Sequence, residues 1–155
     1  MNISIGSPAV FGRATGLRSI LYRSLATPIG GWLTESGALE RFVERNRLRS
    51  LTGHLHHEDG VFYQHVEGEA PAVSRLWASI LRDPRHEQVT ALHLGPIAAR
   101  RFARSPMGFS DGAERSIFDW AARSGLSLKG RHEPQAVAAF LEYASGGDTR
   151  TLPAA

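Results

Sequence analysis

The chain has 155 residues and no cysteine, and its 42% hydrophobic and 21% charged residues are typical of one globular domain. The absence of cysteine excludes disulfides, thiol nucleophiles, iron–sulfur clusters and cysteine-ligated zinc. The net charge of +3 comes from arginines scattered among acidic residues, so the sequence does not favour a nucleic-acid-binding protein.

No run of about eighteen apolar residues occurs, so we expect no contact with a membrane. Residues 1–16 lack the basic and apolar pattern of a secretory signal. We therefore expect a cytoplasmic protein with a loose N-terminal extension over these residues.

The first ordered elements are a strand and a helix. Residues 17–25 predict a strand, with Ile20 and Tyr22 on the same face. A segment with a proline and two glycines ends this strand. Thr34 then caps a helix that runs to Asn46 and carries an apolar stripe at helical spacing.

The most informative stretch is 50–68, which predicts two strands joined by a turn at residues 58–60. In the second strand Phe62, Gln64 and Val66 share one face. A neutral amide between two apolar neighbours costs free energy unless its N–H and C=O groups find partners. Either the fold or a ligand must supply the partners of Gln64.

After these two strands, residues 70–81 predict a helix, which ends at Asp83-Pro84. A fourth strand follows at 89–94 and a fifth at 101–109, where Pro106 makes the last strand an edge or an interrupted one. The order is βαββαβ with one added strand, so we predict a ferredoxin-like α+β fold with two helices on one sheet face.

Two amphipathic helices are predicted after the sheet, at about 113–124 and 133–144. Their apolar stripes need burial, so we expect them to cover the free sheet face or to form a dimer contact. The polar residues 147–155 predict a disordered tail.

Four histidines, His54, His56, His57 and His65, suggest a metal site at first sight. No carboxylate or cysteine completes a known ligand spacing, so we predict no metal and place them as polar residues under the C-terminal helices or at an interface. The sequence also has no nucleophile-elbow motif and no phosphate-binding glycine loop.

Three polar residues converge by topology: Tyr22 on the first strand, Gln64 on the third and Asn46 at the end of the first helix. Each alone reads as an ordinary core or helix-end residue, but together they mark a site between the helices and the sheet. The segment 82–86 is either a surface turn or a grip for a polar or phosphate tail.

These residues resemble the BLUF domains, the blue-light sensors that use FAD. The resemblance runs from about Arg18 to Phe109 and rests on five segments in order. They are LYRSL, ERNRLRSLTGHL, VFYQHVEG, RDPRH and GPIAARRFARSPMGF. The family's ferredoxin-like fold, with the flavin ring between the two helices, agrees with the arrangement predicted above.

The resemblance implies roles for single residues. Tyr22 would donate an electron and a proton to the excited flavin, Gln64 would lie between that tyrosine and the ring, and Met107 would lie on the last strand beside them. The remaining cofactor contacts that it implies are Ile20, Arg45, Asn46, Phe62, Ile80, Asp83, Arg85 and His86. At the position of a tryptophan in many members, this chain has Ser105 followed by Pro106.

The resemblance implies a photoreceptor rather than an enzyme, with FAD bound non-covalently over residues 17–111; FMN stays open. Residues 112–146 would form a helical cap. We expect signalling through a homo-oligomer or a downstream protein. The alternatives are a light-insensitive flavin-binding module, kept open by Ser105-Pro106, and an RRM-like nucleic-acid binder, which needs exposed aromatics on the sheet.

Overall fold

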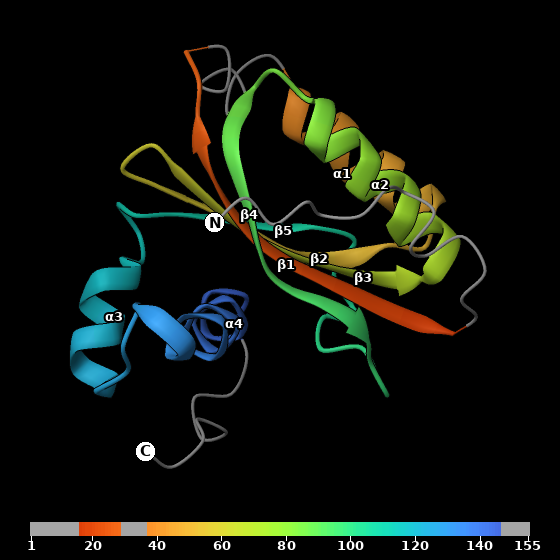
Figure 1. The fold of residues 1–155 in the computed structure, drawn as a ribbon. Coiled ribbons are helices and arrows are strands. Elements are labelled where there is room, and N and C mark those ends of the chain that lie inside the picture. The colour runs from red at the N-terminus through yellow and green to blue at the C-terminus, as the bar shows by residue number, and fades with distance from the viewer. Residues whose placement is uncertain (1–15, 29–36, 147–155) are drawn as a thin grey trace.

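The structure is a computed structural model that describes residues 16–28 and 37–146. Within them, a five-stranded sheet has helices on both faces (Figure 1). The strands are β1 (Leu17–Ala26), β2 (Thr52–Glu58), β3 (Val61–Glu69), β4 (His86–Pro96) and β5 (Gly108–Asp111). The helices are α1 (Ala38–Leu48), α2 (Ala70–Arg82), α3 (Ile117–Ser124), the short 3-10 helix η3 (Gly130–His132) and α4 (Glu133–Ala144).

The sheet has the strand order β4-β1-β3-β2-β5. The first four strands are antiparallel to their neighbours, and β5 runs parallel to β2. The predicted ferredoxin-like fold with an added fifth strand is confirmed. The register pairs Gln64 with Tyr22 on one side and with Leu55 on the other, so three neighbouring strands bring these side chains together.

One face of the sheet is covered by α1 and α2 (Figure 1). The predicted alternation on β1 and β3 is confirmed, because Ile20, Tyr22, Phe62 and Val66 all lie in this core. The buried face of α2, with Val73, Leu76, Trp77 and Ile80, packs against them as the helical spacing predicts. We call this the site face.

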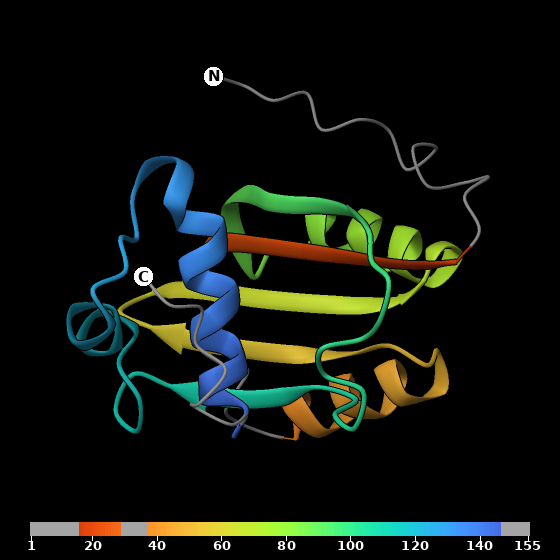
Figure 2. The same ribbon diagram turned by 90° about the horizontal axis from the view of Figure 1, so that it is seen from below.

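The opposite face is covered by α3 and α4, and α4 lies across the strands (Figure 2). Its core contains Leu21, Tyr63, Phe102 and a set of side chains from the two helices. Ile117, Trp120, Val137, Phe140 and Leu141 are all buried there. Phe118 is an exception, since 50% of it is exposed. The prediction that these helices cover the free sheet face is confirmed, and we call this the cap face.

The strand predicted over 101–109 is wrong in its extent, because β5 begins only at Gly108. The reason is a buried carboxylate on β3 of the same sheet. Glu67 accepts hydrogen bonds from the backbone amides of Arg101 (2.9 Å) and Phe102 (2.6 Å), which therefore do not pair with a strand. Pro106 also lacks the amide that a ladder needs. Residues 97–107 consequently form an irregular connection held to the sheet by Glu67.

Other boundaries also differ from the predictions. β4 begins at His86 rather than residue 89, because it pairs with the whole length of β1. α3 begins four residues after the predicted start, since the Asp111 side chain accepts from the amides of Ala113 and Glu114 and holds a turn there. α4 has the predicted bounds.

The described part of α1 begins at Ala38, and the predicted cap Thr34 lies outside the described residues. The same holds for residues 1–15 of the predicted extension and for the predicted tail 147–155. Among the helices that the structure describes, none has the length and apolar character needed to cross a membrane.

Candidate functional site

A pocket opens on the site face, between α1, the end of α2 and the sheet. Its cavity volume is about 60 Å³, and the atom-free space reaches about 480 Å³ only when the open solvent at its mouth is counted. The lining residues are Tyr22, Phe42, Leu55, Phe62, Gln64, Ile80, Asp83, Arg85 and His86. Seven of these nine residues were predicted above as site residues. The pocket has an apolar interior, with polar groups at its floor and mouth.

Tyr22 and Gln64 form the floor, and Met107 contacts Gln64 without lining the pocket. The Tyr22 hydroxyl donates a short hydrogen bond to Gln64 Oε1. The other end of the same amide, Gln64 Nε2, donates to Met107 Sδ at 3.4 Å. All three side chains are at least 95% buried. The fold thus supplies both partners that an amide on an apolar face requires, but one of them is a thioether, which is a weak acceptor.

The Tyr22 phenol is kept protonated by its surroundings. Burial raises its pKa far above the ordinary value, the negative charge of Asp83 adds to this, and Arg85 opposes it. A protonated hydroxyl can act as a donor, which fits its bond to the Gln64 carbonyl oxygen. The Trp77 ring lies next to it, with ring centroids 5.8 Å apart, and its indole N–H has no hydrogen-bond partner among the described residues.

The mouth is built by the turn after α2. Arg85 pairs with Asp83 at 2.6 Å, and the Arg85 backbone amide donates to the same carboxylate. Burial raises the pKa of Asp83, but the hydrogen bonds and charge of Arg85 outweigh it, so the pKa is lowered. His86 bridges two elements, with Nε2 2.9 Å from the Ile80 carbonyl oxygen and Nδ1 2.9 Å from Ser24 Oγ. The carbonyl can only accept, so Nε2 carries the proton.

Four predicted site residues are not in the pocket lining: Met107, which bonds to Gln64 as described above, and Ile20, Arg45 and Asn46. Ile20 is fully buried in the core beneath it, and Arg45 is exposed on α1. Asn46 is 98% buried at the end of α1, yet its Nδ2 has no hydrogen-bond partner among the described residues. A buried amide N–H₂ without an acceptor costs free energy, so Asn46 has a donor that the described residues leave unused.

Sequence reasoning missed Phe42 and Leu55 as pocket residues. Phe42 was part of the predicted apolar stripe of α1, and Leu55 is the residue of β2 that pairs with Gln64. The strand alternation could have identified Leu55, whereas Phe42 could not be told from an ordinary core residue.

The four histidines that suggested a metal site lie outside this pocket. His54, His56 and His65 are buried on the cap face, and His57 contacts Phe62 on the site face with ring centroids 4.7 Å apart. Among the described residues, no group of three or more histidines, aspartates or glutamates can hold a metal ion. The prediction of polar residues under the C-terminal helices is confirmed for the histidines of the cap face, since the His56 ring lies 4.6 Å from that of Phe140 in α4. It does not hold for His57, which lies on the site face.

The comparison with protein families identifies residues 17–108. They match the BLUF model, described as sensors of blue-light using FAD. A 38% identical relative is the photoactivated adenylate cyclase subunit beta of Euglena gracilis, over 86 residues that make up 56% of this chain and 10% of that protein. This chain therefore spans about a tenth of the length of that relative.

Solved structures agree with this match. The dark-state structure of the BLUF protein BlrB is 29% identical, covers 82% of this chain and 98% of its own, and superposes with a TM-score of 0.64. Klebsiella pneumoniae BlrP1, solved with FMN and cyclic diGMP, is 26% identical, covers 81% of this chain and 34% of its own, and has a TM-score of 0.61.

Proposed function

The chain belongs to the BLUF family of blue-light sensors that use FAD, and we propose that Tyr22 and Gln64 carry its light response on a flavin held in the site-face pocket. The observation that carries this proposal is the buried hydrogen-bond chain from the Tyr22 hydroxyl through the Gln64 amide to Met107. It places a phenol with a directed proton and a rotatable amide side by side in one pocket.

The residues present fit a flavin ring. Phe42, Leu55, Phe62 and Ile80 give the pocket apolar walls, which suit a flat heteroaromatic ring. The unpartnered Asn46 Nδ2 provides a donor for a ring carbonyl. We propose that Ile20 packs beneath the ring, that Arg45 contacts its polar edge, and that Asp83, Arg85 and His86 face the ribityl chain and phosphates.

When bound, the flavin supplies blue absorption and, once excited, the pull for an electron. Tyr22 is placed to give an electron and its hydroxyl proton, because that hydroxyl already donates to Gln64 Oε1. Since the phenol is protonated at every physiological pH, the proton is available whenever the electron leaves.

Gln64 converts this event into a lasting change. Its carbonyl end is held by a strong phenol donor, and its amino end only by the Met107 thioether. Rotation of the amide breaks both of these bonds, of which only the one to Met107 is weak, and exchanges the donor and acceptor that Gln64 presents to its neighbours. Tautomerisation makes the carbonyl end a donor without turning the side chain. A new donor to a ring carbonyl would red-shift the absorption, and no net chemical turnover is needed.

The test is Gln64→Leu, which replaces the amide side chain with an apolar one of similar size. The flavin-loaded variant should remain yellow and show no reversible red shift after blue light, whereas the parent should show one. Leu81→Ala, at an exposed apolar residue at the end of α2, serves as the control and should keep the shift. A Gln64→Leu protein with the parent's red shift would contradict the proposal.

The alternative function, a light-insensitive flavin-binding module, would bind flavin in the same way but would lack the photocycle. Ser105 accepts the amide of Gly53 through its backbone oxygen at 3.0 Å, so it helps to hold the connection before Met107 without a tryptophan. The RRM-like alternative is not supported, because the aromatic Tyr63 on the opposite sheet face is buried beneath the cap.

We propose FAD as the bound flavin, with FMN as the alternative that carries the same ring. We also propose that this domain is a sensor without catalytic activity of its own, in the cytoplasm, and that it signals by contact with a second copy or with a downstream protein. The relatives named for cyclase activity carry it in proteins about ten times longer than the matched segment.

A further inference from the structure

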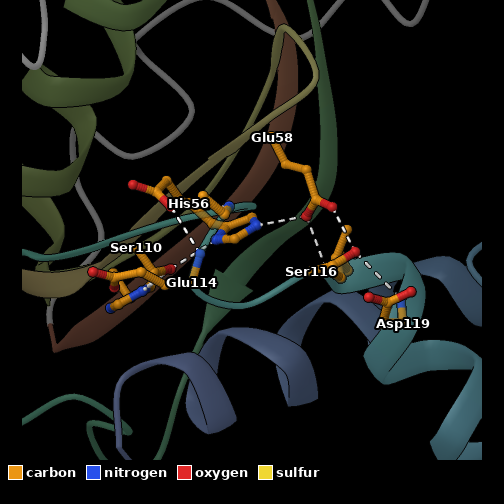
Figure 3. A network of polar contacts seen from close by, with 10 residues as sticks. His56, Glu58, Ser110, Glu114, Ser116 and Asp119 are labelled. Atoms are coloured by element: carbon orange, nitrogen blue, oxygen red, sulfur yellow. Dashed lines mark hydrogen bonds and ion pairs between the residues drawn. The ribbon is translucent and has the colours of Figure 1, made fainter.

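A second buried polar network lies on the cap face and connects β2, β5 and α3 (Figure 3). Ser110 Oγ lies 2.8 Å from His54 Nε2 and 2.7 Å from His56 Nδ1. The other ring nitrogen, His56 Nε2, lies 2.9 Å from Glu58 Oε2. Glu58 also accepts from the hydroxyl of Ser116 at 2.6 Å and from the amide of Ile117 at 2.8 Å.

The hydrogen-bond inventory fixes the direction of this network. A carboxylate only accepts, so His56 Nε2 carries a proton. Burial lowers the pKa of His56, against the opposing effect of Glu58, so the ring is neutral near pH 7 and Nδ1 accepts from Ser110. The Ser110 oxygen is then free to accept from His54 Nε2, whose ring is also neutral because burial lowers its pKa to about 4. Every bond in the chain thus runs toward Glu58.

Glu58 ends the chain at the N-terminus of α3. It is 93% buried, and its carboxylate faces the first amide of a helix whose N-cap is Ser116. A negative charge at this end is stabilised by the helix dipole. Burial raises the pKa of Glu58, but the bonds from His56, Ser116 and Ile117 outweigh it and lower the pKa. The fit is close, because a Cβ at Gly112 would lie 2.5 Å from Glu58 Cγ.

The network also begins near the site. Ser110 stands three residues after Met107, which receives the Gln64 amide on the other face of the sheet. The His56 ring contacts Phe140 of α4 as well. β5 therefore follows directly after a residue that contacts the site, and through Ser110 it bonds to the cap-face histidines of β2.

We propose that Glu58 is a positioning residue that fastens α3 to the sheet and, through His56 and Ser110, makes the helical cap respond to movements of β5. The light-dependent part of this inference rests on the proposed function, and the dark part does not. In this proposal a movement of β5 changes the hydrogen bond between Ser110 and His56. This change weakens the hydrogen bonds that Glu58 accepts from Ser116 and Ile117 at the start of α3.

The experiment is amide hydrogen exchange of the flavin-loaded full chain in the dark and under blue light, with the absorption spectrum recorded on the same sample. Glu58→Gln removes the negative charge and leaves one acceptor oxygen, so the bonds from the Ile117 amide and from His56 Nε2–H, which share Oε2, lose their charged acceptor. We expect the Ile117 amide to exchange about tenfold faster in the dark, because a bond to a charged group becomes a weaker bond to a neutral one. The exposed Glu114→Gln is the matched control, since it makes the same charge change two residues before the helix cap, and it should exchange like the parent.

In the parent, blue light should speed exchange at Ile117, while the central amides of α2 stay unchanged. In Glu58→Gln the red shift should persist, because Glu58 lies on the opposite sheet face from Gln64, and the light-dependent gain at Ile117 should disappear. A parent with a red shift but no change at Ile117 would overturn this inference alone. A parent without a red shift would instead refute the proposed function.

Two further measurements test the proposal even if the Glu58→Gln protein does not fold. Ser116→Ala removes one bond to Glu58 and should speed exchange at Ile117, and Ser116→Thr, which keeps the hydroxyl, should restore the parent rate. Nitrogen chemical shifts should show His56 in the Nε2–H form in the dark, with or without flavin. An Nδ1–H form, or equal exchange in Ser116→Ala and Ser116→Thr, would overturn the assignment.

Discussion

At the residue scale, the site depends on polar side chains whose partners differ in strength. Gln64 is held by a phenol at one end and a thioether at the other, and Asn46 has a buried N–H₂ with no acceptor among the described residues. We propose that a bound ligand accepts from the Asn46 amide and replaces the weak acceptor of the Gln64 amide.

The first prediction concerns Asn46. Asn46→Ala removes the unpartnered donor, so the flavin-free protein should lose little stability, while flavin affinity should fall about tenfold through loss of one hydrogen bond of about 1.4 kcal/mol. Titration with FAD, followed by fluorescence quenching, measures this. Leu48→Ala, at a 70% exposed residue on the same helix, should bind like the parent. Equal affinity of Asn46→Ala and parent would remove Asn46 from the binding site.

The second prediction is a pH dependence of stability from His54. Burial lowers its folded-state pKa to about 4, against 6.5 when unfolded. The unfolded chain therefore binds the proton first, and stability falls as pH drops from 6.5 towards 4, by about 3 kcal/mol from this residue. Glu58 and Glu67, whose pKa values are also lowered, act in the same direction.

Urea unfolding at pH 7 and pH 4.5 measures this effect. His54→Leu should show a smaller loss between the two pH values than the parent, and a replacement of the exposed His132 by Gln should not. An identical pH dependence in His54→Leu and the parent would show that His54 is not held neutral.

Strand alternation predicted that Phe62 and Gln64 share one face of their strand and that Ile20 and Tyr22 share one face of theirs. Most of the other site residues were predicted only from the resemblance to the BLUF family. What the sequence could not give was the unmet donor of Asn46, since a helix-end asparagine usually bonds to solvent or backbone. The Glu58 network was also missed, because its Ser110 and Ser116 come from segments about 50 residues away.

At the element scale, periodicity predicted the helices and the first three strands, because their apolar residues repeat regularly. It failed over 101–109, where the Glu67 side chain, 34 residues earlier, captures two backbone amides. Side chain to backbone bonds across such a distance leave no local pattern. The start of α3 was missed for a similar reason, since Asp111 holds a turn where residues 113–116 have good helix composition.

The third prediction concerns α3 and α4. A chain ended after Asp111 should expose the cap-face core, including Leu21, Tyr63 and Phe102. Each apolar side chain contributes about 1.5–3 kcal/mol when buried, so we expect a stability loss above about 4 kcal/mol, or aggregation. Thermal unfolding and light scattering measure this. A chain ended after Gly146, which keeps both helices, is the control. A soluble Asp111 truncation with the parent's stability and oligomeric state would show that the cap is dispensable.

At the scale of the whole molecule, one sheet separates two cores (Figure 1). The pocket lies on the site face, and the helices that distinguish this chain from a bare βαββαβ unit lie on the cap face. A light-driven change at Gln64 must therefore cross the sheet to alter the outer surface. β5 is suited to this, because it touches the site through Met107 just before its start and the cap network through Ser110.

The central claim is that Tyr22 is the electron and proton donor. Tyr22→Phe removes its hydroxyl and keeps nearly all of its apolar volume, so folding and flavin binding should persist. The deciding measurement is the absorption spectrum of flavin-loaded parent and Tyr22→Phe before and after blue light. The account predicts a red shift that reverses in the dark for the parent and none for the variant, and a reversible red shift in Tyr22→Phe would contradict it.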